Sequence, residues 1–244
     1  MEKKLNAIVV KAVNYGENDK ILTLFSLEEG LISARIKGVK KAGAKLKFAS
    51  EPFCFAEFIL SSSGDKNTVI GASMYEGFYS IRESVESFYA GACVLEFLSK
   101  FALIKEPNAE LFDTAINTLK ELVFTNENKY FSLLIFFVKS LKNTGYALTL
   151  SGCQHCGEEI KTRAFFDANT GAFLCPDCVL ENAIEVSVKT YALIKKALNE
   201  EYEFALDEDL FTDFYLKRAL KFIAFYIEDK TEEKIKALSD LLTL

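Results

Sequence analysis

Two pairs of cysteines in the second half of this 244-residue chain have the spacing of a metal site. Cys153 and Cys156 form one CxxC pair, Cys175 and Cys178 form another, and eighteen residues separate the pairs. Two CxxC turns about 15–20 residues apart are typical of zinc sites. Each turn directs two thiolates at one point, and Zn²⁺ binds four such sulfurs tetrahedrally. The sequence therefore predicts one structural zinc ion held by these four cysteines.

Other uses of clustered cysteines fit this sequence less well. Disulfide bonds would need an oxidising compartment, a thioredoxin-like redox pair would need a βαβ context, and the chain shows neither. Base deaminases carry H-x-E and P-C-x-x-C, whereas His155 is followed by Cys-Gly and Cys175 is preceded by Leu174. Four thiolates leave no open coordination position for catalysis. We therefore expect a structural metal, a bystander role for His155, and a chain that is not an enzyme.

A β-hairpin and several helices are predicted around the cysteine pairs. The sequence TRAFFDANTGAFLC, residues 162–175, is typical of a hairpin that turns at residues 169–171, as in a zinc ribbon. Apolar residues recur with the period of a helix over residues 85–102. Further helical patterns are found near residues 108–124, 129–143, 187–199, 208–228 and 231–242. In the last of these, Thr231 is the predicted N-cap, with two glutamates in the first turn.

The first 75 residues are predicted to be all β. Five segments rich in β-branched and aromatic residues are separated by short turn-like pieces. Five short strands suggest a small closed barrel, for which the OB-fold is the usual solution and an SH3-like barrel the alternative. The predicted fold class is α+β: an N-terminal OB-fold β-barrel followed by an α-helical domain with an inserted four-cysteine zinc ribbon. The predicted domains are residues 1–79 and 80–244, with the zinc module at about 150–180.

The first predicted domain carries a concentration of positive charge. Residues 1–50 contain ten Lys and Arg and five Asp and Glu, although the whole chain has a formal net charge of −6. Because salt screens charges beyond about 10 Å, a distant acidic domain does not cancel such a patch. The segment RIKGVKKAGAKLKF, residues 35–48, has no acid and six positive side chains: Arg35, Lys37, Lys40, Lys41, Lys45 and Lys47.

This basic segment has two interpretations. A run of charge is most often only a solvated surface. Here, however, the run begins at the end of a predicted strand and has small residues between its lysines, which favours a flexible loop on a barrel. Such a loop can follow a phosphate backbone, because lysines that replace condensed counterions release them into solution. We therefore predict that these six residues bind nucleic acid.

Stacking on bases would need exposed aromatic rings as well. Tyr15, in a predicted turn, is a surface candidate for this role. Phe53, Phe55 and Phe58 occupy both faces of one predicted strand and are assigned to the core. Cys54 and Cys93 stand alone in apolar surroundings and are expected to be buried.

Other features narrow the class of protein. No apolar run approaches the roughly 18–20 residues of a membrane-spanning helix. The N-terminus begins with lysines and apolar residues, but no small-residue cleavage site of a signal peptide follows. No G-x-x-x-x-G-K-[ST] phosphate-binding loop is present. We therefore expect a cytoplasmic protein that contacts no membrane.

In their order along the chain, these features resemble the RecO family of bacterial recombination-repair mediators. The resemblance depends on a glycine closely followed by an aspartate, a strand that ends in Leu-Phe, a glycine turn, and a strand that continues into Lys-Gly and further basic residues. Those residues are Gly16, Asp19, Leu24, Phe25, Gly30, Lys37, Gly38, Lys40 and Lys41. The segment PFCFAEF and two CxxC pairs within a helical domain are also similar to the family.

The resemblance implies a function that the residues alone do not. RecO-like proteins bind single- and double-stranded DNA and anneal complementary strands. With RecR they help to load RecA onto strands coated with single-stranded-DNA-binding protein (SSB), and they bind the C-terminal tail of SSB. The alternative left open by the sequence is a zinc-ribbon adaptor of a transcription or RNA-processing complex. An affinity for single-stranded DNA that falls steeply with salt would favour the first function.

Overall fold

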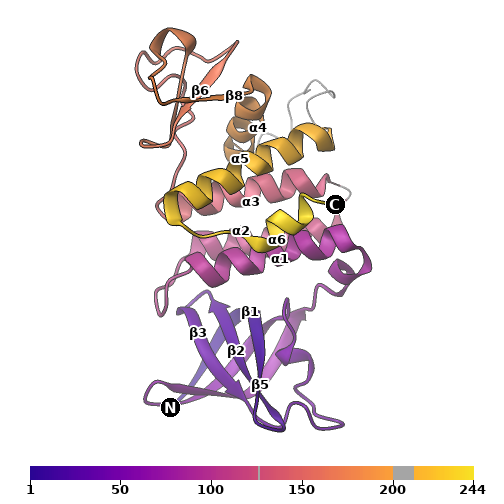
Figure 1. Cartoon of the computed structure of the whole chain (residues 1–244). Helices are drawn as coiled ribbons and strands as arrows, with labels where there is room; N and C mark the ends of the chain where they lie inside the picture. Colours follow the sequence, from indigo (N-terminus) through magenta and orange to yellow (C-terminus); the bar gives the residue numbers. More distant parts are fainter. Residues whose placement is uncertain (126, 200–211) are drawn as a thin grey trace. The chain divides into compact units, whose positions relative to one another are not determined.

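The computed structural model describes residues 1–125, 127–199 and 212–244 (Figure 1). Two compact units divide the chain at Val123 and Phe124. Residues 1–123 are called the barrel unit below, and residues 124–244 the ribbon unit. None of the helices within the described ranges is long and apolar enough to cross a membrane.

Five strands form a closed barrel at the start of the barrel unit. They are β1 (Glu2–Tyr15), β2 (Asp19–Ser26), β3 (Gly30–Ile36), β4 (Phe55–Ser63) and β5 (Lys66–Glu76). Their order around the barrel is β1-β2-β3-β5-β4. Neighbouring strands are antiparallel except for β3 and β5, which pair in parallel. This topology is that of an OB-fold, so the predicted barrel is confirmed and the SH3-like alternative is wrong.

The barrel encloses the apolar residues that alternate along its strands. Leu22, Leu24 and Ile36 are fully buried, as expected when every second side chain of a strand faces the core. Phe53 and Phe58 are also buried, which confirms their assignment. Phe55 differs because it is only half-buried, on the outside of β4.

Two helices follow the barrel within the same unit. A short 3-10 helix (Tyr79–Glu83) leads into α1 (Val85–Phe101), which is followed by α2 (Ala109–Phe124). Ser84 caps α1 by accepting a hydrogen bond from the Ser87 N–H. The helices lie across one end of the barrel (Figure 1), and the ring centroids of Phe25 in β2 and Phe112 in α2 are 5.8 Å apart.

Gly30 is a point of close approach between the barrel and the connection that follows α1. Its φ of +65° lies in the left-handed region that favours glycine. A Cβ atom at this position would overlap the carbonyl oxygen of Glu106 and lie 2.8 Å from that of Leu103. The neighbouring Leu31 N–H donates to the same Leu103 carbonyl at 3.0 Å. A glycine at position 30 therefore allows the start of β3 to pack closely against the connection that follows α1.

Gly30→Ala should lower the free energy of unfolding of the barrel unit by at least about 2 kcal/mol, because it adds both left-handed strain and a steric overlap. The matched control is Gly64→Ala, since Gly64 also has a positive φ, +59°, but no atom within 4 Å of an added Cβ. Urea unfolding of the two variants measures the difference. Equal losses in both would contradict the close approach at Gly30.

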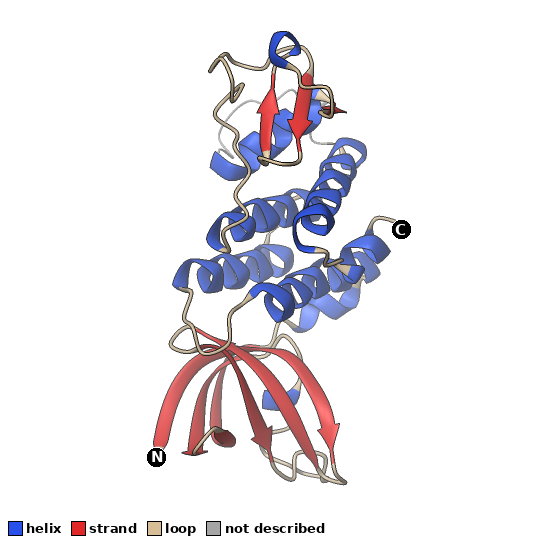
Figure 2. Cartoon of the chain, turned by 60° about the vertical axis from the view of Figure 1, so that its left-hand side comes forward, coloured by secondary structure: helices blue, strands red, loops and turns tan. Residues whose placement is uncertain are grey.

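The ribbon unit, in its described residues, combines four helices with a small sheet (Figure 2). The helices are α3 (Lys129–Asn143), α4 (Val188–Asn199), α5 (Asp213–Thr231) and α6 (Lys236–Leu241). The strands β6 (Ala164–Asp167), β7 (Ala172–Leu174) and β8 (Ile184–Val186) form an antiparallel sheet in the order β7-β6-β8. This sheet lies between α3 and α4 in the sequence. The predicted hairpin and its place within the helical region are therefore confirmed.

One predicted helix start is wrong. Thr231 is the last residue of α5 rather than the N-cap of the final helix. The Thr231 hydroxyl donates to the carbonyl of Ile227, and Glu232 takes a left-handed φ of +58° that ends the helix. The final helix, α6, begins at Lys236. The preceding predicted helix covers residues 208–228, and its first four residues, 208–211, lie outside the described residues.

Candidate nucleic-acid interface and metal centre

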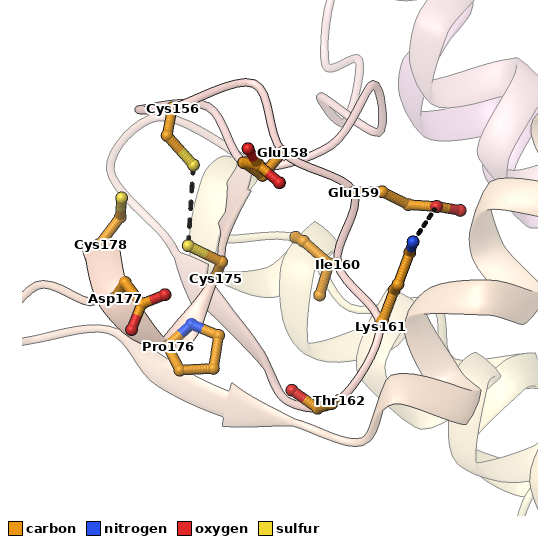
Figure 3. Close-up of a pocket in the computed structure, with 10 residues that line it drawn as sticks. All are labelled: Cys156, Glu158, Glu159, Ile160, Lys161, Thr162, Cys175, Pro176, Asp177 and Cys178. Atoms are coloured by element: carbon orange, nitrogen blue, oxygen red, sulfur yellow. Dashed lines mark hydrogen bonds and ion pairs between the residues drawn. The ribbon is translucent and has the colours of Figure 1, made fainter.

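Four cysteine sulfurs converge in the ribbon unit, and three of these side chains are drawn in Figure 3. The Sγ atoms of Cys153, Cys156, Cys175 and Cys178 all lie within 4.8 Å of one another. Cys156 Sγ is 3.8 Å from Cys175 Sγ. Four sulfurs placed tetrahedrally at about 2.3 Å from one ion would be about 3.8 Å apart. The four residues predicted from their spacing are therefore brought together in a way that could hold one metal ion.

Local backbone geometry places these sulfurs. The Cys153 N–H donates to the Glu158 carbonyl at 2.8 Å, and the Gly157 N–H donates to the Cys153 carbonyl at 2.8 Å. In the second pair the Cys178 N–H donates to the Cys175 carbonyl at 3.1 Å. Gly152 has a φ of +127°, and a Cβ there would lie 2.9 Å from the Glu158 carbonyl oxygen. Each CxxC pair is thus a tight turn that directs its two thiols to the same side.

The surroundings of these thiols shift their pKa values in opposite directions. Burial opposes ionisation of the Cys153 thiol, but nearby backbone N–H groups, that of Cys156 foremost, lower the pKa of Cys153 to about 6. Burial and the neighbouring Cys175 sulfur raise the pKa of Cys178 to about 12. Thiols bind metals as thiolates, so binding of a divalent ion would displace the remaining protons.

The open side of the cluster is acidic. Cys156 is exposed, and the pocket beside it is lined by Glu158, Glu159 and Asp177 (Figure 3). The one lysine in this lining, Lys161, is paired with Glu159 at 3.3 Å. His155 is exposed and is not a member of the four-cysteine group. This surface has the wrong charge to attract a polyanion, which favours a structural role for the cluster.

Aromatic packing connects the ribbon to the helices of its unit. Phe166 of β6 and Phe173 of β7 are fully buried. The Phe166 ring lies 4.9 Å from that of Phe222 in α5, and the Phe173 ring lies 4.9 Å from that of Tyr191 in α4. Loss of order at the cysteine cluster would therefore also disturb the packing of the core of the ribbon unit.

The basic segment forms a loop of successive turns between β3 and β4 in the barrel unit. Backbone hydrogen bonds of 3.2–3.3 Å close these turns. The Lys41 N–H donates to the Gly38 carbonyl, the Ala44 N–H to the Lys41 carbonyl, and the Lys47 N–H to the Ala44 carbonyl. The buried side chain of Val39 and the partly buried Leu46 and Phe48 pack against the barrel core. The loop is thus fixed at several points, which differs from the flexible loop expected from the sequence.

The side chains of the five lysines of this loop point to solvent and are not paired with carboxylates at salt-bridge distance in the described residues. Lys37, Lys40, Lys41, Lys45 and Lys47 are all exposed, and none forms a side-chain hydrogen bond or ion pair within the described part of the chain. Elsewhere on the same barrel, Lys3, Lys4 and Lys20 are each paired with a glutamate. The loop therefore holds its positive charge available for a partner outside the chain.

Arg35, the sixth predicted residue, has a different environment. Its guanidinium is paired with the Asp19 carboxylate, which also accepts the Gly38 N–H at 2.7 Å. Its Cζ lies 4.9 Å from the centroid of the Tyr15 ring. The Gly38 N–H and then the Arg35 guanidinium hold the pKa of Asp19 below its usual range. Asp19 thus fixes both Arg35 and the start of the basic loop, a role that sequence reasoning missed because the contact depends on strand register.

Asp19→Asn should destabilise the barrel unit, because it removes the charge that binds Arg35 and the Gly38 N–H. Since the folded-state pKa of Asp19 is lowered, its stabilisation is present at neutral pH and is lost as the pH falls below the usual value of about 3.9. The difference in free energy of unfolding between wild type and variant should be constant from about pH 5 to 7 and shrink below about pH 4. A difference independent of pH would contradict this role.

Cys54 and Cys93 are buried in the barrel unit, as expected. Burial raises the pKa of the Cys54 thiol to about 11. Neither residue is a member of the four-cysteine group. The two isolated cysteines are therefore core residues, and the metal-binding chemistry of the described chain resides in the ribbon.

Comparison with known proteins agrees with this combination of barrel, helices and cysteine cluster. The protein-family model described as "Recombination protein O N terminal" matches residues 1–78. The family model described as "Recombination protein O C terminal" matches residues 82–239. DNA repair protein RecO of Desulforamulus reducens is 31% identical over 235 residues, covering 93% of this chain and 90% of that protein. DNA repair protein RecO of Acetivibrio thermocellus is 32% identical over 179 residues, covering 73% and 71%. Since the two family models together span nearly all of its elements, the chain belongs to the RecO family.

Proposed function

We propose that this chain is a DNA-binding mediator of recombination repair, and that the loop between β3 and β4 binds the phosphate backbone. The observation that carries the proposal is the group of five exposed lysines that form no ion pair within the described residues, on a loop fixed to an OB-fold barrel. The relatives, which are DNA repair proteins RecO, support the same function. The proposed DNA-binding residues are Arg35, Lys37, Lys40, Lys41, Lys45 and Lys47.

The proposed mechanism is electrostatic and makes or breaks no covalent bond. Two complementary strands repel each other because each carries one negative charge per nucleotide. Lysines that replace condensed counterions on both strands reduce this repulsion and gain entropy from the released ions. The chain would therefore bind single- and double-stranded DNA and accelerate annealing without nucleotide hydrolysis.

The division of labour follows the predicted domains. Residues 1–79 would bind DNA, and residues 80–244 would bind partner proteins. By membership of the family, these partners are RecR and the C-terminal tail of SSB, through which RecA is loaded indirectly. The site of action would be the cytoplasm, where the DNA is found and where reduced cysteines persist.

We infer that the ion held by the four cysteines is zinc, one per chain. Four thiolates in a tetrahedral arrangement are the ligand set that Zn²⁺ takes in structural sites. Its contribution would be to fold the ribbon, since four protein ligands leave no position for a substrate. The acidic surface beside Cys156 supports a role away from DNA.

A strand-annealing assay tests this function. Two complementary dye-labelled oligonucleotides are mixed, bare or coated with SSB, with and without RecR. We expect wild-type protein to accelerate annealing at low salt and the acceleration to disappear at high salt. A folded, metal-loaded protein that binds neither strand nor duplex would contradict the proposal and favour the zinc-ribbon adaptor instead.

A further inference from the structure

Tyr15 is an exposed aromatic residue at the edge of the basic loop. It is the last residue of β1, and 50% of its surface is accessible. Its hydroxyl makes no hydrogen bond with any residue that the structure describes. Other rings of the barrel unit, such as those of Phe25 and Phe58, are fully buried. An exposed ring whose hydroxyl is not held by a hydrogen bond is a suitable surface for stacking.

The Tyr15 ring is supported from one side. The Arg35 guanidinium lies over it at 4.9 Å, and Arg35 is itself held by Asp19 through Nε at 2.8 Å and through Nη2. A guanidinium covers only one face of a ring, so the exposed half of Tyr15 remains available to a second planar group. Because Asp19 fixes Arg35, little side-chain entropy would be lost when that group binds.

The same contacts bring Tyr15 to the base of the lysine loop. The turn that follows Tyr15 is hydrogen-bonded to the loop, because the Asn18 carbonyl accepts the Lys40 N–H at 3.0 Å and the Asp19 carboxylate accepts the Gly38 N–H at 2.7 Å. The side chain of Val13, two residues before Tyr15 on the same face of β1, is also exposed. An apolar, aromatic surface therefore lies directly beside the free lysines.

We propose that Tyr15, backed by Arg35, is a stacking platform for an unpaired nucleobase of a single strand whose phosphates contact the lysine loop. This inference rests on the proposed DNA-binding function and adds to it a reason to prefer single strands. The bases of a duplex are already stacked on one another and cannot reach the ring, whereas those of a single strand can. The lysines set the overall affinity, and Tyr15 sets the discrimination between single strand and duplex.

The test compares Tyr15→Ala and Tyr15→Phe on three DNA ligands: a mixed-sequence single strand, an abasic strand of the same length, and the duplex. Stacking contributes about 1–3 kcal/mol per base, which is roughly a 5- to 150-fold change in affinity. We expect Tyr15→Ala to lose affinity in that range for the single strand only, with an unchanged salt dependence. Tyr15→Phe keeps the ring and should bind as wild type does.

Tyr75→Ala is the matched control. Tyr75 is 54% exposed and bonded through its hydroxyl to Asn6. Asn6 is nine residues from Tyr15 along β1, which corresponds to roughly 30 Å measured along the strand. The Tyr75→Ala variant should bind the single strand with the affinity of wild type. If Tyr15→Ala binds the single strand as tightly as wild type, or loses as much affinity for the abasic strand, the stacking role is overturned while DNA binding stands. If wild type binds none of the three ligands, both proposals fail.

Discussion

Replacing the five free lysines with alanine is expected to lower the affinity for single-stranded DNA by roughly 100- to 1000-fold at 0.1 M salt, because each phosphate contact on a single strand releases about 0.7 of a counterion. The residues to change together are Lys37, Lys40, Lys41, Lys45 and Lys47. Fluorescence anisotropy of a labelled oligonucleotide measures the affinity. The fold should survive, since all five side chains are exposed and form no hydrogen bond or ion pair within the described residues.

A charge-matched control distinguishes the effect of the loop lysines on DNA affinity from the effect of the total net charge. It replaces five other exposed lysines, four of them in the ribbon unit, so that the formal charge changes by the same amount. These are Lys120, Lys161, Lys221, Lys234 and Lys236. We expect this variant to retain affinity within a few-fold of wild type. An equal loss of affinity in both variants would mean that DNA binding depends on the total charge of the protein rather than on the loop, and the proposed interface would be wrong.

Cys175→Ser is expected to abolish tight zinc binding and to lower the free energy of unfolding of the ribbon unit by at least about 3 kcal/mol, because structural zinc couples directly to folding. The Cys175 side chain is largely buried and its sulfur lies 3.8 Å from that of Cys156. Purified wild-type protein should contain about one zinc ion per chain by elemental analysis. Thermal or urea unfolding of the variant measures the loss of stability.

His155→Ala is the control for the metal site. His155 lies between the cysteines of the first pair but is exposed and outside the sulfur cluster. This variant should retain its zinc and its stability. Wild-type protein that is stable and metal-free would contradict the assignment of the site. A variant at His155 that loses zinc would show that the ligand set is wrong.

Features that depend on local sequence were predicted correctly. A CxxC turn places its two sulfurs through a few backbone hydrogen bonds, so the spacing of Cys153 to Cys178 was sufficient to identify the cluster. The strands of the barrel alternate between buried and accessible residues, and β2 shows this in Leu22 and Leu24. The hairpin of β6 and β7 turns at a glycine, Gly171, with a φ of +70°. Each of these signals is contained within a short segment.

Features that depend on distant contacts were not predictable. The pairing of Arg35 with Asp19 requires the register of β2 against β3, in which Lys20 lies opposite Ile36. Thr231 followed by two glutamates has the composition of a helix start, yet the apolar face of α5 keeps Tyr226 and Ile227 buried and extends the helix to that threonine. Packing over many residues decided both outcomes, and a short sequence pattern carries no information about it.

The dependence of wild-type affinity for single-stranded DNA on salt concentration is the most direct test of the central claim that the loop between β3 and β4 binds the phosphate backbone. With about four to six phosphates contacted, a plot of log affinity against log salt should have a slope of about −3 to −4. In the five-lysine variant the slope should approach zero. A wild-type affinity that stays constant across the salt series, or a slope that survives removal of the five lysines, would contradict the claim.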